Sequence, residues 1–288
     1  LRCTHCITDA PALTASGRAR TLPRFLLEAL RPHLAHASYF GFVHGGETLA
    51  AGPLFFDTLA AIADARAGAP TAVHLLTNGM LLTPGMLERL VAAGVTSLSV
   101  SIDGATAATN DAIREGARLE RVLQHLREAV ALRNERRWDL RIGVSTVLMA
   151  ENLPELNALV ELAADVGVDW LKLEELVPAT PLARRSLLAL ASGATSAAAA
   201  RAVAEGARRG LVVVDHTRER ALYHCRLDDD ERAFLDADGF ANRATPHPCR
   251  APWEHVTVDP QGDVRLVDFH GPVLGNLAEA DLRALFAG

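Results

Sequence analysis

Residues 95–104 read Val-Thr-Ser-Leu-Ser-Val-Ser-Ile-Asp-Gly, so apolar and small polar side chains alternate along this segment. Leu98, Val100 and Ile102 fall on one side of an extended chain and the serines on the other, because successive side chains of a strand point to opposite faces. The pattern therefore predicts a β-strand with one buried face. Small polar groups on the second face are typical of a sheet that faces a ligand.

Short apolar runs and amphipathic helices alternate on both sides of this strand. Further strands are predicted at residues 38–43, 73–76, 140–148 and 168–173, helices at about 21–30, 55–62, 83–94, 122–130, 153–166 and 196–209, a hairpin at 253–258 and 264–267, and a short helix from about 278. Thr83 and Asn152 are expected to be the N-caps of two of these helices. Five strand–helix units in series predict parallel βαβ geometry, either a barrel or a doubly wound sheet.

The composition excludes several classes of protein. The 288 residues carry a formal net charge of −6, with no basic stripe of the kind that a nucleic-acid-binding protein uses to contact phosphates. No apolar run reaches the roughly 20 residues that a membrane span needs, and the first residues do not have the layout of a signal peptide. We therefore expect a soluble, cytoplasmic protein that binds neither nucleic acid nor membrane.

Cysteine use points to a metal or redox site. Cys3, Cys6, Cys225 and Cys249 are too few for a disulfide scaffold in a chain of this length. The segment Cys3-Thr4-His5-Cys6 places two thiols three residues apart, a spacing at which both can bind one metal ion or cluster. Thioredoxin-like redox sites, zinc sites and unliganded thiol pairs share this spacing, so the motif alone leaves these alternatives open.

Polar segments follow three of the predicted strands. They are Gly-Gly-Glu at residues 45–47, Thr-Asn-Gly at 77–79 and Asp-Gly at 103–104. Glycines at these points permit close approach of the backbone to a ligand, although each segment alone is compatible with an ordinary turn. Because ligands of parallel barrels gather at the carboxyl ends of the strands, we expect a binding site at this edge.

In this order, the motifs resemble those of the radical S-adenosylmethionine (SAM) superfamily. The cysteine segment is similar to the end of the family pattern C-x-x-x-C-x-x-C, whose first cysteine would lie before Leu1, and the later segments are similar to the family's G-G-E-P and S-x-S-[IL]-D-G motifs, with Thr48 in place of the proline. The resemblance implies an α/β protein with a partial (β/α)6 TIM-like barrel. The first strand of that barrel would precede Leu1 and so be missing from this chain.

The resemblance also implies the cofactors and their ligands. Cys3 and Cys6, with the third cysteine, would hold a [4Fe–4S] cluster with one iron open to SAM. By the same resemblance, the residues that bind SAM are His5, Gly45, Gly46, Glu47, Asn78, Ser101, Asp103, Arg114 and Ser145. The guanidinium of Arg114 suits the SAM carboxylate, and the alternative for Arg114 is a solvated helix charge.

A second unit is predicted after residue 215, where the pattern changes. Cys249 and Gly262 resemble the opening of the SPASM or twitch extension, which binds auxiliary iron–sulfur clusters, but Val267 stands where that pattern has its next cysteine. We therefore expect a radical SAM core barrel at residues 1–215 and an incomplete SPASM/twitch-like α+β extension at 216–288. Cys249 is then a candidate ligand of a possible auxiliary cluster.

The catalytic residues are not identified by any motif. Cys225, Asp268 and Glu175 are candidates, and one of the three charged residues that end the last predicted strand, Lys172, Glu174 and Glu175, is expected to point into the barrel.

The resemblance implies reductive cleavage of SAM to a 5′-deoxyadenosyl radical, which abstracts a hydrogen from the substrate. The electron would come from a low-potential donor such as flavodoxin or ferredoxin, and the tail favours a ribosomally synthesised peptide as substrate. Two alternatives remain. One is a radical SAM dehydrogenase or epimerase that acts on a small molecule in antibiotic or sugar biosynthesis. The other is a non-catalytic binding module, a zinc-stabilised or degenerate barrel.

Overall fold

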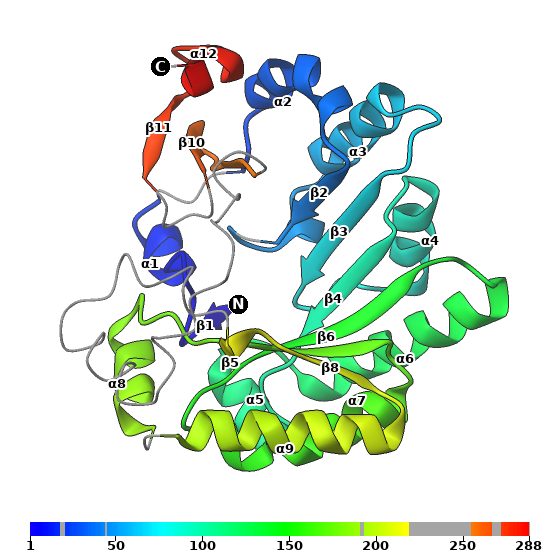
Figure 1. Ribbon diagram of the computed structural model, residues 1–288, viewed down its shortest axis with the longest axis vertical. Coiled ribbons are helices and arrows are strands. Elements are labelled where there is room, and N and C mark those ends of the chain that lie inside the picture. Colours follow the sequence, from blue (N-terminus) through cyan, green and yellow to red (C-terminus); the bar gives the residue numbers. More distant parts are fainter. Residues whose placement is uncertain (18–20, 44, 191–192, 219–254, 267–271, 288) are drawn as a thin grey trace.

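The computed structural model describes residues 1–17, 21–43, 45–190, 193–218, 255–266 and 272–287 of the chain. In this part, six parallel strands form one curved sheet in the order β2-β3-β4-β6-β7-β8 (Figure 1). The strands are β2 (Tyr39–Phe42), β3 (Ala72–Thr77), β4 (Ser97–Ser101), β6 (Arg141–Val147), β7 (Trp170–Glu174) and β8 (Val212–Asp215). A parallel sheet with helices between its strands confirms the predicted α/β fold of a partial barrel.

Five of these strands are the predicted ones, and the edge strand β8 is an addition. Its sequence, Val-Val-Val-Asp, has no alternation between apolar and polar residues, and Val212 is 60% exposed. A short edge strand buries little surface, so its pattern carries little signal in the sequence. The strand expected before Leu1 stays a prediction.

Helices fill the connections between the strands. They are α3 (Pro53–Ala65), α4 (Pro84–Ala92), α5 (Ala107–Ile113), α6 (Leu119–Arg136), α7 (Leu156–Val166), α8 (Pro181–Ala189) and α9 (Ala194–Arg209), with α1 (Ala10–Ala15) and α2 (Arg24–Leu30) before β2 and the 3-10 segments η1 (Arg31–His36), η2 (Thr48–Ala50), η3 (Leu153–Glu155) and η4 (His216–Arg218). In Figure 1, α3, α4, α6, α7 and α9 lie along the outer side of the sheet. The main hydrophobic core lies between these helices and the strands, and its members with 0% exposure include Leu75, Leu98, Val100, Ile142 and Leu171. None of the described helices is long and apolar enough to cross a lipid bilayer.

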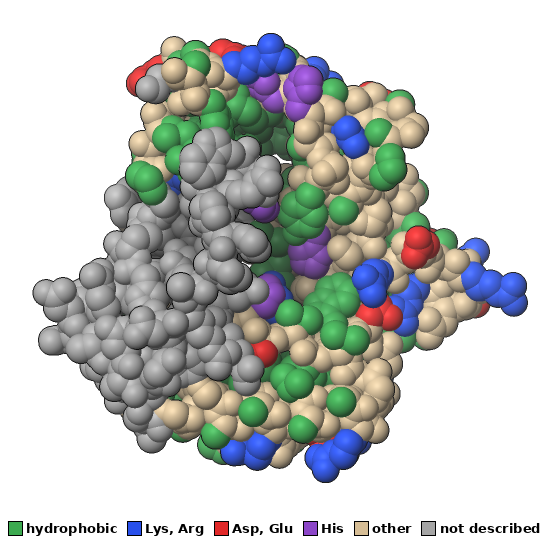
Figure 2. All heavy atoms as spheres, viewed as in Figure 1, with side chains coloured by type: hydrophobic (Ala, Val, Ile, Leu, Met, Phe, Trp, Pro, Cys, Tyr) green, Lys and Arg blue, Asp and Glu red, His purple; other side chains and the backbone are tan. Residues whose placement is uncertain are grey.

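The other face of the sheet is concave. Leu98 and Val100 of β4 are buried in the core beneath the helices, so the serines that alternate with them lie on the concave face. Figure 2 shows a hollow on this side of the molecule, in which hydrophobic and histidine side chains are visible. The serine-bearing face predicted from residues 95–104 is thus the concave face, on which Ser99 and Ser101 are buried, with exposed fractions of 1% and 7%.

The two predicted helix caps have different outcomes. Thr83 Oγ1 accepts a hydrogen bond from Met86 N and Pro84 is the first residue of α4, as predicted. Asn152 is the N-cap residue of η3, as predicted, but its side chain makes no capping hydrogen bond to that segment. Asn152 Nδ2 donates to the carbonyl oxygens of Asp103 and Val147, at 2.9 and 2.8 Å. A partner 49 residues away along the chain is invisible to a local pattern, so the sequence suggested the ordinary role of an asparagine before a helix.

Two small antiparallel sheets complete the described structure. β1 (Arg2–Cys3) pairs with β5 (Arg114–Glu115), while β9 (Thr257–Val258), β10 (Asp263–Arg265) and β11 (Val273–Asn276) form a three-stranded sheet before α12 (Leu282–Ala287). The β9–β10 pair and α12 confirm the predicted hairpin and helix. Leu26 of α2 packs against Val264 and Leu277 of this small unit. The division of the chain at residue 215 stays a prediction.

Candidate functional site

The loop that carries Cys3 and Cys6 is fixed by main-chain contacts. Cys6 N donates to Cys3 O at 3.3 Å, which closes a turn between the two cysteines. Thr4 N donates to Ile113 O at 2.9 Å, and Thr4 O accepts from Thr180 Oγ1 at 2.7 Å. The loop is thereby tied to the end of α5 and to the start of α8, so the positions of both thiols are set by distant parts of the chain.

Both sulfur atoms have polar neighbours. Ala10 N donates to Cys6 Sγ at 3.3 Å, and Arg114 Nη1 lies 3.9 Å from Cys3 Sγ. Burial raises the pKa of the Cys3 thiol, although the charge of Arg114 opposes that shift. A thiolate at Cys3 therefore needs additional positive charge, which a metal centre supplies. Within the described part of the chain, no set of three His, Cys, Asp or Glu side chains is placed to hold a metal ion.

Asp103 is the centre of a buried ionic cluster at the end of β4. Its side chain is 0% exposed. Asp103 Oδ1 accepts from Val147 N at 2.8 Å, while Oδ2 lies 2.6 Å from Arg114 Nε and 3.4 Å from His5 Nε2. Asp103 thus joins β4 to the cysteine loop, to β5 and to β6. Its Oδ1 is hydrogen-bonded, whereas Oδ2 and Arg114 Nε form an ion pair by distance but make no hydrogen bond among the described residues.

His5 contributes an unusual feature to this cluster. Burial lowers the pKa of His5, an effect that the carboxylate of Asp103 opposes. His5 Nδ1 is a buried nitrogen that finds no hydrogen-bond partner among the described residues. Buried polar atoms in proteins are normally hydrogen-bonded, so this nitrogen marks a place where a ligand or water fits.

A second cluster joins the ends of β2 and β3. Gly45 and Gly46 have φ angles of 83° and 124°, a region that favours glycine, and they lead into Glu47. Glu47 Oε1 accepts from Thr77 Oγ1 at 2.6 Å and Glu47 Oε2 from Asn78 N at 2.8 Å. The Gly-Gly-Glu and Thr-Asn-Gly segments predicted separately are therefore one structural unit. Thr77 belongs to the predicted Thr-Asn-Gly segment but was not among the predicted SAM-binding residues.

The remaining predicted site residues lie at the same edge or outside the described residues. Ser101 and Ser145 are cross-strand neighbours in β4 and β6, and their exposed fractions are 7% and 6%. Glu175 directly follows β7 and is half-buried. The predicted residues thus lie in the cysteine loop, in β5, or in or after the carboxyl-terminal parts of five strands, β2, β3, β4, β6 and β7, of one parallel sheet. Residues of the prediction that lie outside the described part are Cys225, Cys249 and Asp268.

A group of titratable residues on the concave face was missed or left undecided by the sequence. Lys172 and Glu174 form an ion pair on β7, and His216 Nδ1 lies 3.7 Å from Glu174 Oε2. Burial opposes ionisation of Glu174, but the neighbouring His216 and Lys172 hold its pKa at about 2. On β3, burial and the charge of Lys172 lower the pKa of His74 to about 4. In the sequence, Lys172 and Glu174 alternate with leucines that are buried. This alternation was the signal that both charged side chains lie on the same face of β7.

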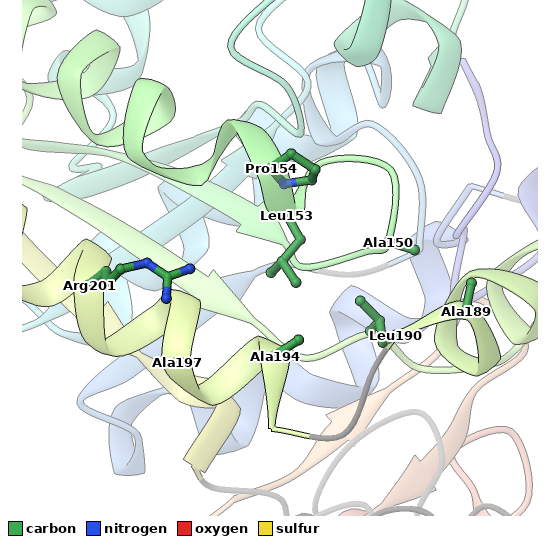
Figure 3. A pocket seen from close by; sticks show the side chains of 8 residues that line it. All are labelled: Ala150, Leu153, Pro154, Ala189, Leu190, Ala194, Ala197 and Arg201. Carbon is green, nitrogen blue, oxygen red and sulfur yellow. The ribbon is translucent and has the colours of Figure 1, made fainter.

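An apolar pocket lies apart from these clusters, where the connection after β6 meets α8 and α9 (Figure 3). Its volume is about 440 Å³. It is lined by Ala150, Leu153, Pro154, Ala189, Leu190, Ala194, Ala197 and Arg201. None of the predicted site residues is in its lining, so the pocket is separate from the site at the strand ends.

Comparison with known proteins relates the chain to one family. The model of the radical SAM superfamily matches residues 1–163. An AdoMet-dependent heme synthase of Methanosarcina barkeri is 33% identical over 173 residues, which are 58% of this chain and 44% of that protein. A PqqA peptide cyclase of Streptomyces rochei is 30% identical over 194 residues, which are 67% of this chain and 47% of that protein.

Among solved structures, Streptococcus suis SuiB bound to its precursor peptide SuiA has a TM-score of 0.65 and 12% identity, and the match covers 91% of this chain and 58% of SuiB. At this identity the likeness concerns the fold. The matched part spans less than half the length of the heme synthase and of the peptide cyclase.

Proposed function

The chain belongs to the radical SAM superfamily, and on this premise we propose that it modifies a ribosomally synthesised peptide with the help of a [4Fe–4S] cluster and SAM. The family implies both cofactors. When bound, the cluster supplies the electron that cleaves SAM to a 5′-deoxyadenosyl radical, the species that takes a hydrogen atom from the substrate. The observation that carries the proposal is the buried ionic group of His5, Asp103 and Arg114 side chains. This group ties the Cys3–Cys6 loop to the end of β4.

Cys3 and Cys6 are the proposed iron ligands, together with the third cysteine expected before Leu1. Their surroundings fit such a role. A main-chain N–H donates to Cys6 Sγ, as is common for cluster sulfurs, and Arg114 places positive charge beside Cys3. Iron also supplies the charge that a thiolate at the buried Cys3 requires. The described residues complete neither a zinc nor an iron ligand set, so metal analysis of the reconstituted protein distinguishes the cluster from a zinc-stabilised module.

The SAM-binding roles are assigned to residues at the edge of the sheet. Arg114 Nε lies 2.6 Å from Asp103 Oδ2, and the residue is 8% exposed; the N–H groups at the end of its guanidinium are proposed to bind the SAM carboxylate beside the cysteine loop. Ser101 and Ser145 are proposed to contact SAM from the concave face. Glu47 holds the two strand-end loops together, so that the adjacent glycine backbone can approach the ammonium group of SAM.

The substrate class rests on the relatives. The PqqA peptide cyclase supports a peptide substrate, because its match spans 67% of the chain. A tetrapyrrole is the second candidate, because the heme synthase has the higher identity of the two, 33%. The electron donor is proposed to be a low-potential protein such as flavodoxin or ferredoxin, and Cys249 stays a proposed ligand of an auxiliary cluster.

The test is a reconstitution of the protein without oxygen, followed by iron and sulfide analysis and by incubation with SAM and dithionite. We expect about four irons per chain for one cluster, or about eight with an auxiliary cluster, together with 5′-deoxyadenosine. Candidate precursor peptides and porphyrins are then added separately, and mass spectrometry detects which of them is modified. Zinc in place of iron, with SAM uncleaved, would overturn the proposed function.

A further inference from the structure

Lys172 is the only lysine among the 29 lysine and arginine residues of the sequence. It lies in β7, where Leu171 and Leu173 on either side of it have 0% exposure and belong to the core beneath the helices. Lys172 is therefore on the concave face, and its side chain is 26% exposed there. An ammonium group differs from a guanidinium because it is a compact point charge with three donors on a flexible stem.

The strand register places Lys172 beside the proposed SAM site. Ser101 of β4 pairs with Ser145 of β6, and Ser145 pairs with Lys172 of β7, so the three residues form one row across the sheet. Neighbouring strands are about 4.8 Å apart, so Lys172 lies one strand from Ser145 and two strands from Ser101. If SAM lies over the two serines, a substrate that approaches from the side of β7 passes Lys172.

Around Lys172, the carboxylate acceptors of Glu174 have neighbours, but the N–H donors of Lys172 are only partly used. Lys172 Nζ pairs with Glu174 Oε1, and Glu174 Oε2 faces His216 Nδ1 at 3.7 Å, so each carboxylate oxygen has a cationic or donor neighbour. The described residues provide Lys172 Nζ with no second partner, which leaves two of its three N–H groups for a ligand. The surface around Lys172 therefore contains unused hydrogen-bond donors. A ligand group with acceptor oxygens would be complementary to them.

An aromatic wall adjoins this cation. The rings of His74 and Trp170 lie 6.3 Å apart between centroids, and the Trp170 ring covers Gly143 so closely that a Cβ there would overlap it. His74 is neutral at pH 7, because burial and the charge of Lys172 lower its pKa to about 4. A flat, uncharged surface thus lies next to the two unused N–H groups of Lys172.

We propose that Lys172 anchors a substrate subsite on the concave face that binds a carboxylate of the substrate, with Trp170 and His74 against the group that carries it. The inference rests on the proposed function, since it takes the neighbouring serines as the place of SAM. A glutamate or aspartate of a peptide and a carboxyethyl side chain of a tetrapyrrole present the same carboxylate. The experiment therefore distinguishes these two sources.

The test measures dissociation constants of four probes by calorimetry, with and without SAM. The probes are a capped hexapeptide with one glutamate, its glutamine analogue, a porphyrin with carboxyethyl side chains, and the methyl ester of that porphyrin. The wild-type protein is expected to bind one of the two acids about tenfold or more tightly than its neutral analogue. Which acid does so identifies the source of the carboxylate.

Variants assign the effect to the lysine. In Lys172→Met the preference for the acid disappears, and in Lys172→Arg a large part of it remains, whereas the affinity for SAM stays unchanged in both. Arg31→Met is the matched control, because it removes an exposed cation that is paired with Glu28 on a remote part of the chain. An acid preference that persists in Lys172→Met, or is absent from the wild type, overturns the proposal, and so does a loss of SAM affinity in Lys172→Met.

A chemical measurement covers the case in which Lys172→Met does not fold. Because Lys172 is the sole side-chain amine of the chain, its acetylation in the wild-type protein can be followed by peptide mass spectrometry. The acid probe should slow this acetylation and its neutral analogue should not; equal rates refute the subsite. Failure to cleave SAM with an intact, lysine-dependent acid preference would instead count against the proposed function alone.

Discussion

Replacement of Asp103 by asparagine tests the ionic cluster that joins the cysteine loop to the sheet. The asparagine oxygen can still accept from Val147 N, but its NH2 group would then face Arg114 Nε and His5 Nε2, which lie 2.6 and 3.4 Å from the present oxygen. Arg114 is 8% exposed and would lose its carboxylate partner without gaining access to water. The substitution thus leaves a buried charge without compensation while it keeps the volume of the side chain.

The expected cost is about 3 to 5 kcal/mol of unfolding free energy, the range for breaking one partner of a buried ion pair. For a domain of this size each kcal/mol lowers Tm by about 2 to 4 °C, so the expected decrease is on the order of 10 °C. Iron retained after reconstitution should also decrease, because His5 and the cysteine loop lose the group that holds them. Thermal unfolding without oxygen and iron analysis measure the two effects.

Two further variants make this reasoning refutable. Asp57→Asn breaks the exposed pair between Asp57 and Arg24 and should change Tm by much less, because exposed pairs contribute little. Asp103→Asn combined with Arg114→Gln should be more stable than Asp103→Asn alone, since the uncompensated charge is then absent. If Asp103→Asn costs no more than Asp57→Asn, or the double variant gains nothing, the cluster does not act as described.

Three further outcomes are expected. Cys6→Ser should abolish iron binding after reconstitution with little change in circular dichroism, and retention of the wild-type iron content would contradict its role as a ligand. Gly143→Ala should cost about 1 to 3 kcal/mol in urea denaturation because its Cβ would overlap the Trp170 ring, whereas Gly85→Ala in α4 has no neighbour in its way and should be neutral or stabilising. The pKa of Glu174 is lowered to about 2, so its contribution to stability is present above about pH 4.5 and is lost as the pH falls toward 2; a Glu174→Gln variant with the same acid dependence as the wild type would disprove this.

Local periodicity accounts for what the sequence determined by itself. The alternation around Leu98, Val100 and Ile102 predicted a strand with a buried face, and these side chains are all 0% exposed. The predicted N-cap at Thr83 depends on its contact with Met86, three residues later, so it too was readable. The spacing of Cys3 and Cys6 and the polar segments after the strands likewise depend on residues close together in the chain, and they sufficed to suggest the family that comparison shows.

Contacts between distant segments were decided by the tertiary structure alone. Asp103 draws its partners from the cysteine loop, β5 and β6, and Asn152 binds the main chain of Asp103. A period of two residues tells which face of its strand Lys172 occupies, but the order of the strands sets its neighbours, and that order places it beside Ser145. Strand order follows from the packing of all helices and strands around one core, and no short segment encodes it. For that reason the sequence identified the residue types of the site, whereas the fold decided which of them meet.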